Sequence, residues 1–124
     1  MDSEKERVAS SLRGLVARTA KGKVKWIESE SDGFYTDSMG IRIWIDAREG
    51  SFEGEDYVIS FYSLPENSQI FEFTDVDLKD VLQNSFLVMR GLYQQARLMA
   101  RGYRDKLDQV LDDLIKDDPD HIPF

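Results

Sequence analysis

The spacing of the apolar residues changes twice along the chain. Between residues 23 and 73, apolar and polar residues alternate with a period of two, which is typical of antiparallel strands with one buried face. On both sides of this stretch, apolar residues recur every three or four positions, which is typical of amphipathic helices. The sequence therefore predicts an α+β fold: an antiparallel β-meander of four to five strands, with an N-terminal helix and one long or two consecutive C-terminal helices.

Length and turn residues set the expected boundaries. A chain of 124 residues favours a single domain over 1–124, with a helix in 1–22, the meander in 23–73, a helical region in 74–116 and an irregular tail in 117–124. Thr74 or Asp75 is expected to cap the helical region. One helix over 76–116 would be about 60 Å long at 1.5 Å per residue, so a break near Gly102 is expected.

The net charge of −8 is unevenly distributed. Residues 1–25 carry seven basic and three acidic groups, and residues 81–106 carry five basic and one acidic. Residues 26–80 carry fourteen acidic and three basic groups, and residues 107–124 carry six acidic and one basic. Two interpretations stay open: basic helices neutralise an acidic sheet inside the fold, or charged faces are left free for a partner.

Residues for catalysis and metal binding are scarce. The chain has no cysteine, which excludes thiolate chemistry and disulfides, and its only histidine is His121 in the tail. The sequence contains neither GxxxxGK(S/T), the phosphate-binding loop of nucleotide hydrolases, nor GxGxxG, the dinucleotide-binding motif. Asp75, Asp77 and Asp80 form an acidic cluster whose simplest interpretation is capping of a helix, with a magnesium site as the lesser alternative. We therefore predict no catalytic residue, no metal site and no cofactor.

Four residues are predicted to bind a partner. Arg97, Arg101 and Arg104 would line one helix face if the helix stayed regular through Gly102. Trp44 lies on the strand face opposite the isoleucines of the same strand. It is either an exposed anchor for a partner or a residue buried under helices that cover both faces of the sheet, and the second interpretation is slightly favoured.

The order of motifs resembles a known kind of protein. The segments 20–26 (AKGKVKW) and 92–97 (LYQQAR) flank the meander, and an Asp- and Leu-rich helix follows. This is similar to small bacterial or phage-borne α+β proteins with no assigned activity. The resemblance implies a meander flanked by helices and brings no catalytic residue.

Together these features predict a non-enzymatic macromolecular interaction module that binds an unidentified protein or another copy of itself. One alternative is an inhibitor, immunity or anti-defence protein with an acidic face against a basic enzyme. Another is a small carboxylate-based enzyme or ligand-binding protein. The acidic net charge makes nucleic acid an unlikely partner. No stretch approaches the roughly 20 apolar residues of a membrane span, and the charged start is unlike a signal peptide, so a cytoplasmic location is expected.

Overall fold

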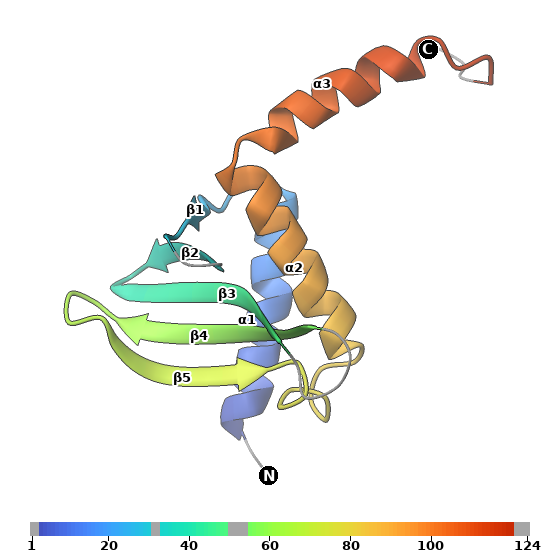
Figure 1. The fold of residues 1–124 in the computed structure, drawn as a ribbon. Helices are drawn as coiled ribbons and strands as arrows, with labels where there is room; N and C mark the ends of the chain where they lie inside the picture. Colours follow the sequence, from blue (N-terminus) through green and yellow to red (C-terminus); the bar gives the residue numbers. More distant parts are fainter. Residues whose placement is uncertain (1–2, 31–32, 50–54, 121–124) are drawn as a thin grey trace.

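The computed structural model describes residues 3–30, 33–49 and 55–120, and it confirms the predicted α+β fold (Figure 1). One helix precedes a five-stranded antiparallel sheet, and two consecutive helices follow it. The elements are α1 (Ser3–Ala20), β1 (Ile27–Glu28), β2 (Gly33–Ser38), β3 (Ile41–Glu49), β4 (Glu55–Ser63), β5 (Ser68–Thr74), α2 (Ser85–Ala100) and α3 (Tyr103–Ile115). His121, the only histidine, lies outside the described residues.

The sheet is a simple meander in which each strand pairs with the next, in the order β1-β2-β3-β4-β5. Met39 and Gly40 join β2 to β3 with φ angles of 53° and 79°, the left-handed conformation that tight hairpin turns require. The edge strand β1 has only two residues. The alternation in 23–26 predicted a strand there, but these residues precede β1, and buried Trp26 packs into the core instead.

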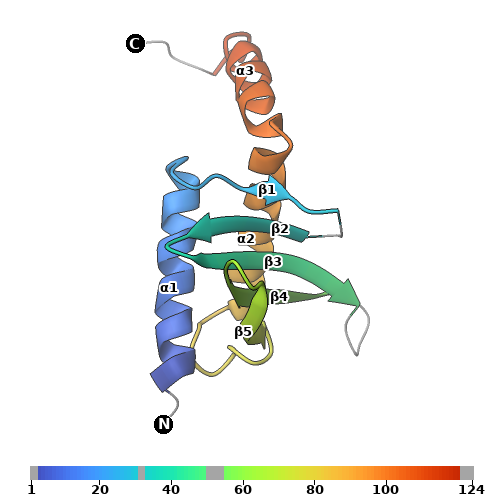
Figure 2. The same cartoon turned by 90° about the vertical axis from the view of Figure 1, so that its left-hand side faces the viewer.

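Both α1 and α2 contribute their buried residues to the same face of the sheet. The register aligns Phe34, Ile45 and Ile59 across β2, β3 and β4. These side chains form one cluster with buried residues of α1 and α2, including Leu12 and Met89. The predicted alternation in β3 is therefore confirmed, with Ile45 inside this cluster. Figure 2 shows α2 behind the sheet and α1 beside it.

The prediction of helix from residue 74 onward is wrong for residues 75–84, which form turns. Thr74 and Asp77 do exchange the two hydrogen bonds of a capping box, of 3.0 and 2.9 Å. The chain then turns so that Leu78 and Leu82 both reach the core, and Asn84, at φ 56°, interrupts any helix before α2 begins. Leu78 and Leu82 are thus spaced as in a helix, but they reach the core from a segment of turns.

The expected break near Gly102 is present, and of the two alternatives the structure has two helices. Gly102 adopts φ 70°, and its N–H and that of Arg101 bond to carbonyl oxygens in the last turn of α2. α3 then leaves in a new direction and extends away from the rest of the molecule (Figure 1). Among the described elements, α3 contacts only α2. No helix in the described part of the chain is long and apolar enough to cross a membrane.

Candidate interaction surfaces

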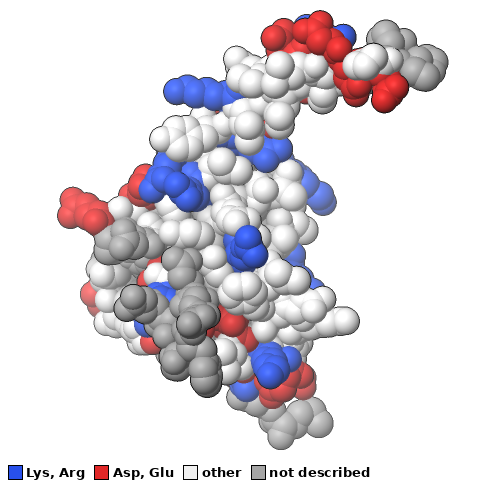
Figure 3. Space-filling view, turned by 45° about the vertical axis from the view of Figure 1, so that its right-hand side comes forward, with Lys and Arg blue, Asp and Glu red and all other residues white. Residues whose placement is uncertain are grey.

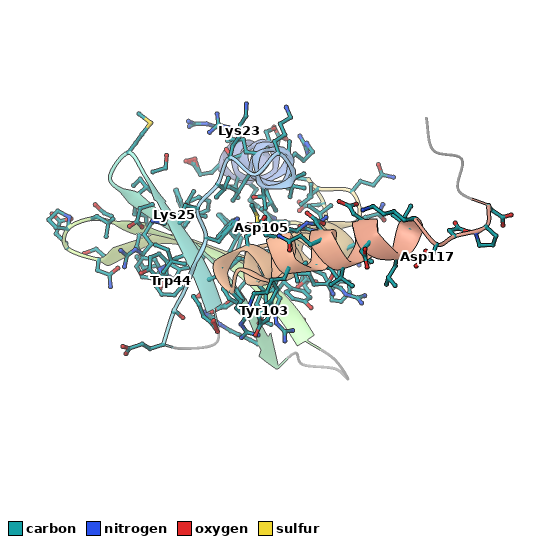
Figure 4. All side chains as sticks on the ribbon, turned by 90° about the horizontal axis from the view of Figure 1, so that it is seen from above. Lys23, Lys25, Trp44, Tyr103, Asp105 and Asp117 are labelled. Carbon is teal, nitrogen blue, oxygen red and sulfur yellow. The ribbon has the colours of Figure 1, made fainter. Side chains whose placement is uncertain are left out.

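Trp44 lies on the sheet face that none of the three described helices covers. Figure 4 shows α1 on one side of the sheet and Trp44 on the other. The interpretation that helices cover both faces is therefore wrong. The indole is nevertheless half-buried, because it packs against two tyrosines of neighbouring strands. Its ring centroid is 4.9 Å from that of Tyr35 and 6.2 Å from that of Tyr62.

The charged side chains around Trp44 are largely paired with one another. Arg42 donates two hydrogen bonds, of 2.7 and 3.0 Å, to the carboxylate of Asp37, and its guanidinium lies 4.1 Å from the Tyr35 ring centroid. Arg48 donates a 2.7 Å hydrogen bond to Glu72. The two arginines of β3 thus each hold one acidic side chain of a neighbouring or nearby strand, Asp37 of β2 and Glu72 of β5. These two carboxylates are therefore less available to a basic partner.

Two buried polar atoms of this face have no hydrogen-bond partner among the described residues: Nε1 of Trp44 and Oδ1 of Asp46. The other oxygen of Asp46 lies 3.6 Å from Arg48, whose guanidinium already bonds Glu72 more closely. Burial raises the pKa of Asp46, and the nearby charge of Arg48 offsets only part of that effect. The ionised carboxylate of Asp46 is therefore a cost to the folded state at neutral pH.

We expect Asp46→Asn to raise the free energy of unfolding at pH 7, by about 1 kcal/mol. Because the folded-state pKa of Asp46 lies above its ordinary value of 3.8, the cost is present above the raised pKa. It disappears as the pH falls toward and below 3.8. Urea denaturation of both proteins at pH 7 and pH 3.5 checks this. A difference that is the same at both pH values would contradict the prediction.

The predicted arginine face does not form, because the helix breaks at Gly102. Arg97 and Arg101 lie near the end of α2, whereas Arg104 lies on α3 and pairs with Asp108 at 3.0 Å. Arg101 donates three hydrogen bonds of 2.8–3.1 Å to the carboxylate of Glu28. These bonds hold the pKa of Glu28 below its ordinary value. A role of Trp44 or of these arginines in binding a partner stays a prediction.

The acidic cluster predicted for capping is used to hold the turns between β5 and α2. Asp75 accepts a 2.9 Å hydrogen bond from the buried N–H of Tyr57, and Asp77 bonds the N–H of Thr74. Asp80 pairs with Lys5 of α1 at 3.1 Å. The three carboxylates therefore have three separate structural partners. Among the described residues, no group of three metal-ligating side chains is placed to hold an ion.

The most conspicuous surface of the structure is the apolar side of α3, which we did not select from the sequence. None of the residues of α3 is buried. Five apolar residues recur along one side of this helix, and each is between 38% and 61% exposed: Tyr103, Leu107, Val110, Leu111 and Leu114. We call them the α3 stripe. Their spacing is visible in the sequence as helical periodicity, but that signal normally indicates a buried face.

A groove runs between α1 and α2 and has a volume of about 910 Å³. About half of its lining residues are small or aliphatic, among them Leu87, Gly91 and Met99, and the others are polar, among them Gln94 and Gln95. Arg104, Asp105 and Asp108 of α3 line one end. Figure 4 shows Asp105 on the side of α3 toward α1 and Tyr103 on the opposite side. The polar side of α3 therefore faces this groove, and the α3 stripe faces away from it.

Comparisons with known proteins found no match, whether to family models, to curated proteins or to solved structures. The function must therefore be inferred from these surfaces.

Proposed function

We propose that the protein is a non-enzymatic interaction module that binds another protein chain through α3. The observation that carries this proposal is the α3 stripe, which lies exposed on a helix that extends from the domain. An isolated helix of 13 residues is marginally stable in water, and most helices in proteins are stabilised by packing their apolar side. A helix of this kind suits recognition in which its apolar side enters a groove of a partner.

The distribution of polar groups supports binding more than catalysis. On the sheet face around Trp44, Asp37 and Glu72 are engaged by arginines, which leaves these two carboxylates poorly placed for general acid or base work. In the acid-rich block proposed for an inhibitor, Glu28, Asp37 and Glu72 are likewise each paired with an arginine. By contrast, none of the five residues of the α3 stripe belongs to the core cluster formed by the described residues or packs against it.

Site-specific crosslinking tests this proposal. A photo-crosslinking amino acid in place of Val110, in the middle of the α3 stripe, is expected to give covalent adducts in living cells, because this position would be buried in the complex. The same substitution at Met39 is the control, since Met39 is fully exposed at the β2–β3 turn. The adducts are detected as a discrete increase in mass on a denaturing gel.

The crosslinking result at Val110 decides whether the partner binds through α3 or through the sheet face around Trp44. Adducts at Val110 that are absent at Met39 would support binding through α3. The absence of adducts at Val110, together with adducts from a crosslinker at Gln69 beside Tyr62, would move the interface to the sheet face and contradict the proposal. No adduct at any of these positions would also contradict it.

A further inference from the structure

We infer that the partner of α3 is a second copy of this chain, whose groove between α1 and α2 receives the α3 stripe. This inference rests on the proposed function and adds the identity of the partner and of the docking site. In a symmetric dimer, each chain would insert its own α3 into the groove of the other. Both halves of such an interface are present in every copy of the chain.

The direction of α3 keeps the α3 stripe out of the groove of its own chain. Only Arg101 and Gly102 separate α2 from α3. Arg101 is fixed by its three hydrogen bonds to Glu28 and lies over the Phe34 ring, with its guanidinium carbon 5.8 Å from the ring centroid. With this anchor in place, the polar side of α3 faces its own groove and the stripe points away. The stripe is therefore presented to another molecule.

The helix and the groove have matching lengths. At 1.5 Å per residue, the 13 residues of α3 extend about 20 Å. The groove is lined along α2 from Leu87 to Met99, which is about 18 Å at the same rise. Gly91 lies in the middle of this wall, where a side chain would meet no atom within 4 Å of its Cβ. A helix can therefore approach α2 closely at Gly91.

The charges of the two elements are complementary. No acidic residue occurs in 7–27 or in 81–104, the segments that contain most of α1 and all of α2. Residues 107–118 carry five aspartates and one lysine. Figure 3 shows acidic side chains gathered on the extended α3, while the basic ones lie mostly on the body below it.

Several of the basic side chains of α1 and α2 are not held in ion pairs by the described residues. On α1 and α2, five cations form no ion pair with any described residue: Arg7, Arg13, Arg18, Arg90 and Arg97. They lie on the helices that border the groove, whereas the basic residues in its lining are Lys21 and Arg104. Direct pairing of two α3 helices would instead bring their aspartates together, which is unfavourable. Among the described residues, the only acids that line the groove are Asp105 and Asp108 of α3, at one end, and Asp108 is already paired with Arg104. Charge thus favours the groove of a second copy over pairing along the whole α3 of a second copy.

The first test is the mass of the purified full chain in solution, measured by sedimentation over a range of concentrations. We expect a dimer of about 29 kDa, twice the 14.3 kDa of one chain. Gly91→Leu would fill the groove, and we expect it to raise the dissociation constant at least about 100-fold. Gly14→Leu is the matched control, because Gly14 is an equally open helical glycine outside this groove. Both substitutions favour helix, so loss of folding is not expected for either.

The second test mixes two variants that are each expected to be monomeric. Gly91→Leu keeps an intact α3, and the triple variant Leu107→Gln, Leu111→Gln, Leu114→Gln keeps an intact groove. The mixture should form heterodimers at concentrations where neither variant associates alone, because one helix-in-groove contact is restored. Raising the salt concentration should weaken the wild-type dimer.

Three results would overturn the inference. A wild-type chain that stays monomeric up to about 1 mM would exclude the dimer. In that case adducts of Val110 with a different protein would leave the proposed function standing, and their absence would remove both. If the Gly91→Leu variant dimerises like the wild type and the mixture forms no heterodimer, the groove is not the docking site. Such a result would indicate that two α3 helices pair directly. A dimer that salt strengthens would point to the same pairing.

Discussion

Replacing Trp26 by alanine is expected to lower the free energy of unfolding by about 3–5 kcal/mol, the usual cost of removing a large buried aromatic side chain. Trp26 is 4% exposed and belongs to the core cluster, between α1 and the first strand. Its Nε1 donates a 3.1 Å hydrogen bond to Oγ1 of Thr19, which is itself buried. One side chain therefore attaches the end of α1 to the edge of the sheet. Urea denaturation followed by circular dichroism measures the loss.

Conservative variants separate the packing of Trp26 from its hydrogen bond. Trp26→Phe keeps most of the apolar contact but leaves the Thr19 hydroxyl without its donor, so a cost of about 1–3 kcal/mol is expected. The double variant Trp26→Phe, Thr19→Val should lose less free energy of unfolding than the sum of the losses in the two single variants. The reason is that no unpaired polar group remains in the double variant. A loss below about 1 kcal/mol for Trp26→Ala would show that Trp26 is not an anchor of the core.

The sheet could be predicted from the sequence because strand alternation is a local signal. Ile41, Ile43 and Ile45 face one side of β3 whatever surrounds them, and short turns between strands force neighbouring strands to pair. The break at Gly102 was predictable for a similar reason, since a continuous helix would have exceeded the size of the domain. Each of these predictions depended on a few neighbouring residues.

The errors occurred where distant contacts decide the structure. Leu78 and Leu82 have helical spacing, but the hydrogen bonds of Asp75 to Tyr57 and of Ser85 to the carbonyl of Asp75 bend this segment into turns. Neither bond can be inferred from spacing. Similarly, the pairing of Arg101 with Glu28 joins residues 73 positions apart in the sequence. It converts a predicted binding residue into part of the framework that directs α3.

The binding surface was missed because periodicity does not reveal whether an apolar side is covered. The α3 stripe has the same spacing as the buried side of α2, where Met89, Leu92 and Ala96 reach the core. The difference lies in the chain path after Gly102, which carries α3 away from the sheet. The sequence did contain one indication, the acidic block that begins at residue 107, and the structure places this block on an extended helix.

Making the α3 stripe polar should abolish association and leave the fold intact. In the variant Leu107→Gln, Leu111→Gln, Leu114→Gln, a symmetric dimer would lose six leucine contacts. At about 1 kcal/mol or more for each, the dissociation constant would rise about 10⁴-fold. The monomer should unfold within about 0.5 kcal/mol of the wild type, because all three leucines are exposed in it.

Thermal denaturation at several protein concentrations separates the two effects. The melting temperature of a dimer rises with concentration, since association stabilises the folded chain by mass action. We therefore expect the wild type to show this dependence and the triple variant to melt at one temperature throughout. Ile115→Gln, at the end of α3 and outside the stripe, is the control and should behave like the wild type. If the free energy of unfolding of the monomeric triple variant were lower than that of the wild-type monomer by more than about 2 kcal/mol, the α3 stripe would have to pack within its own chain. In that case α3 would be part of the monomer core and could not be the element that binds a second copy.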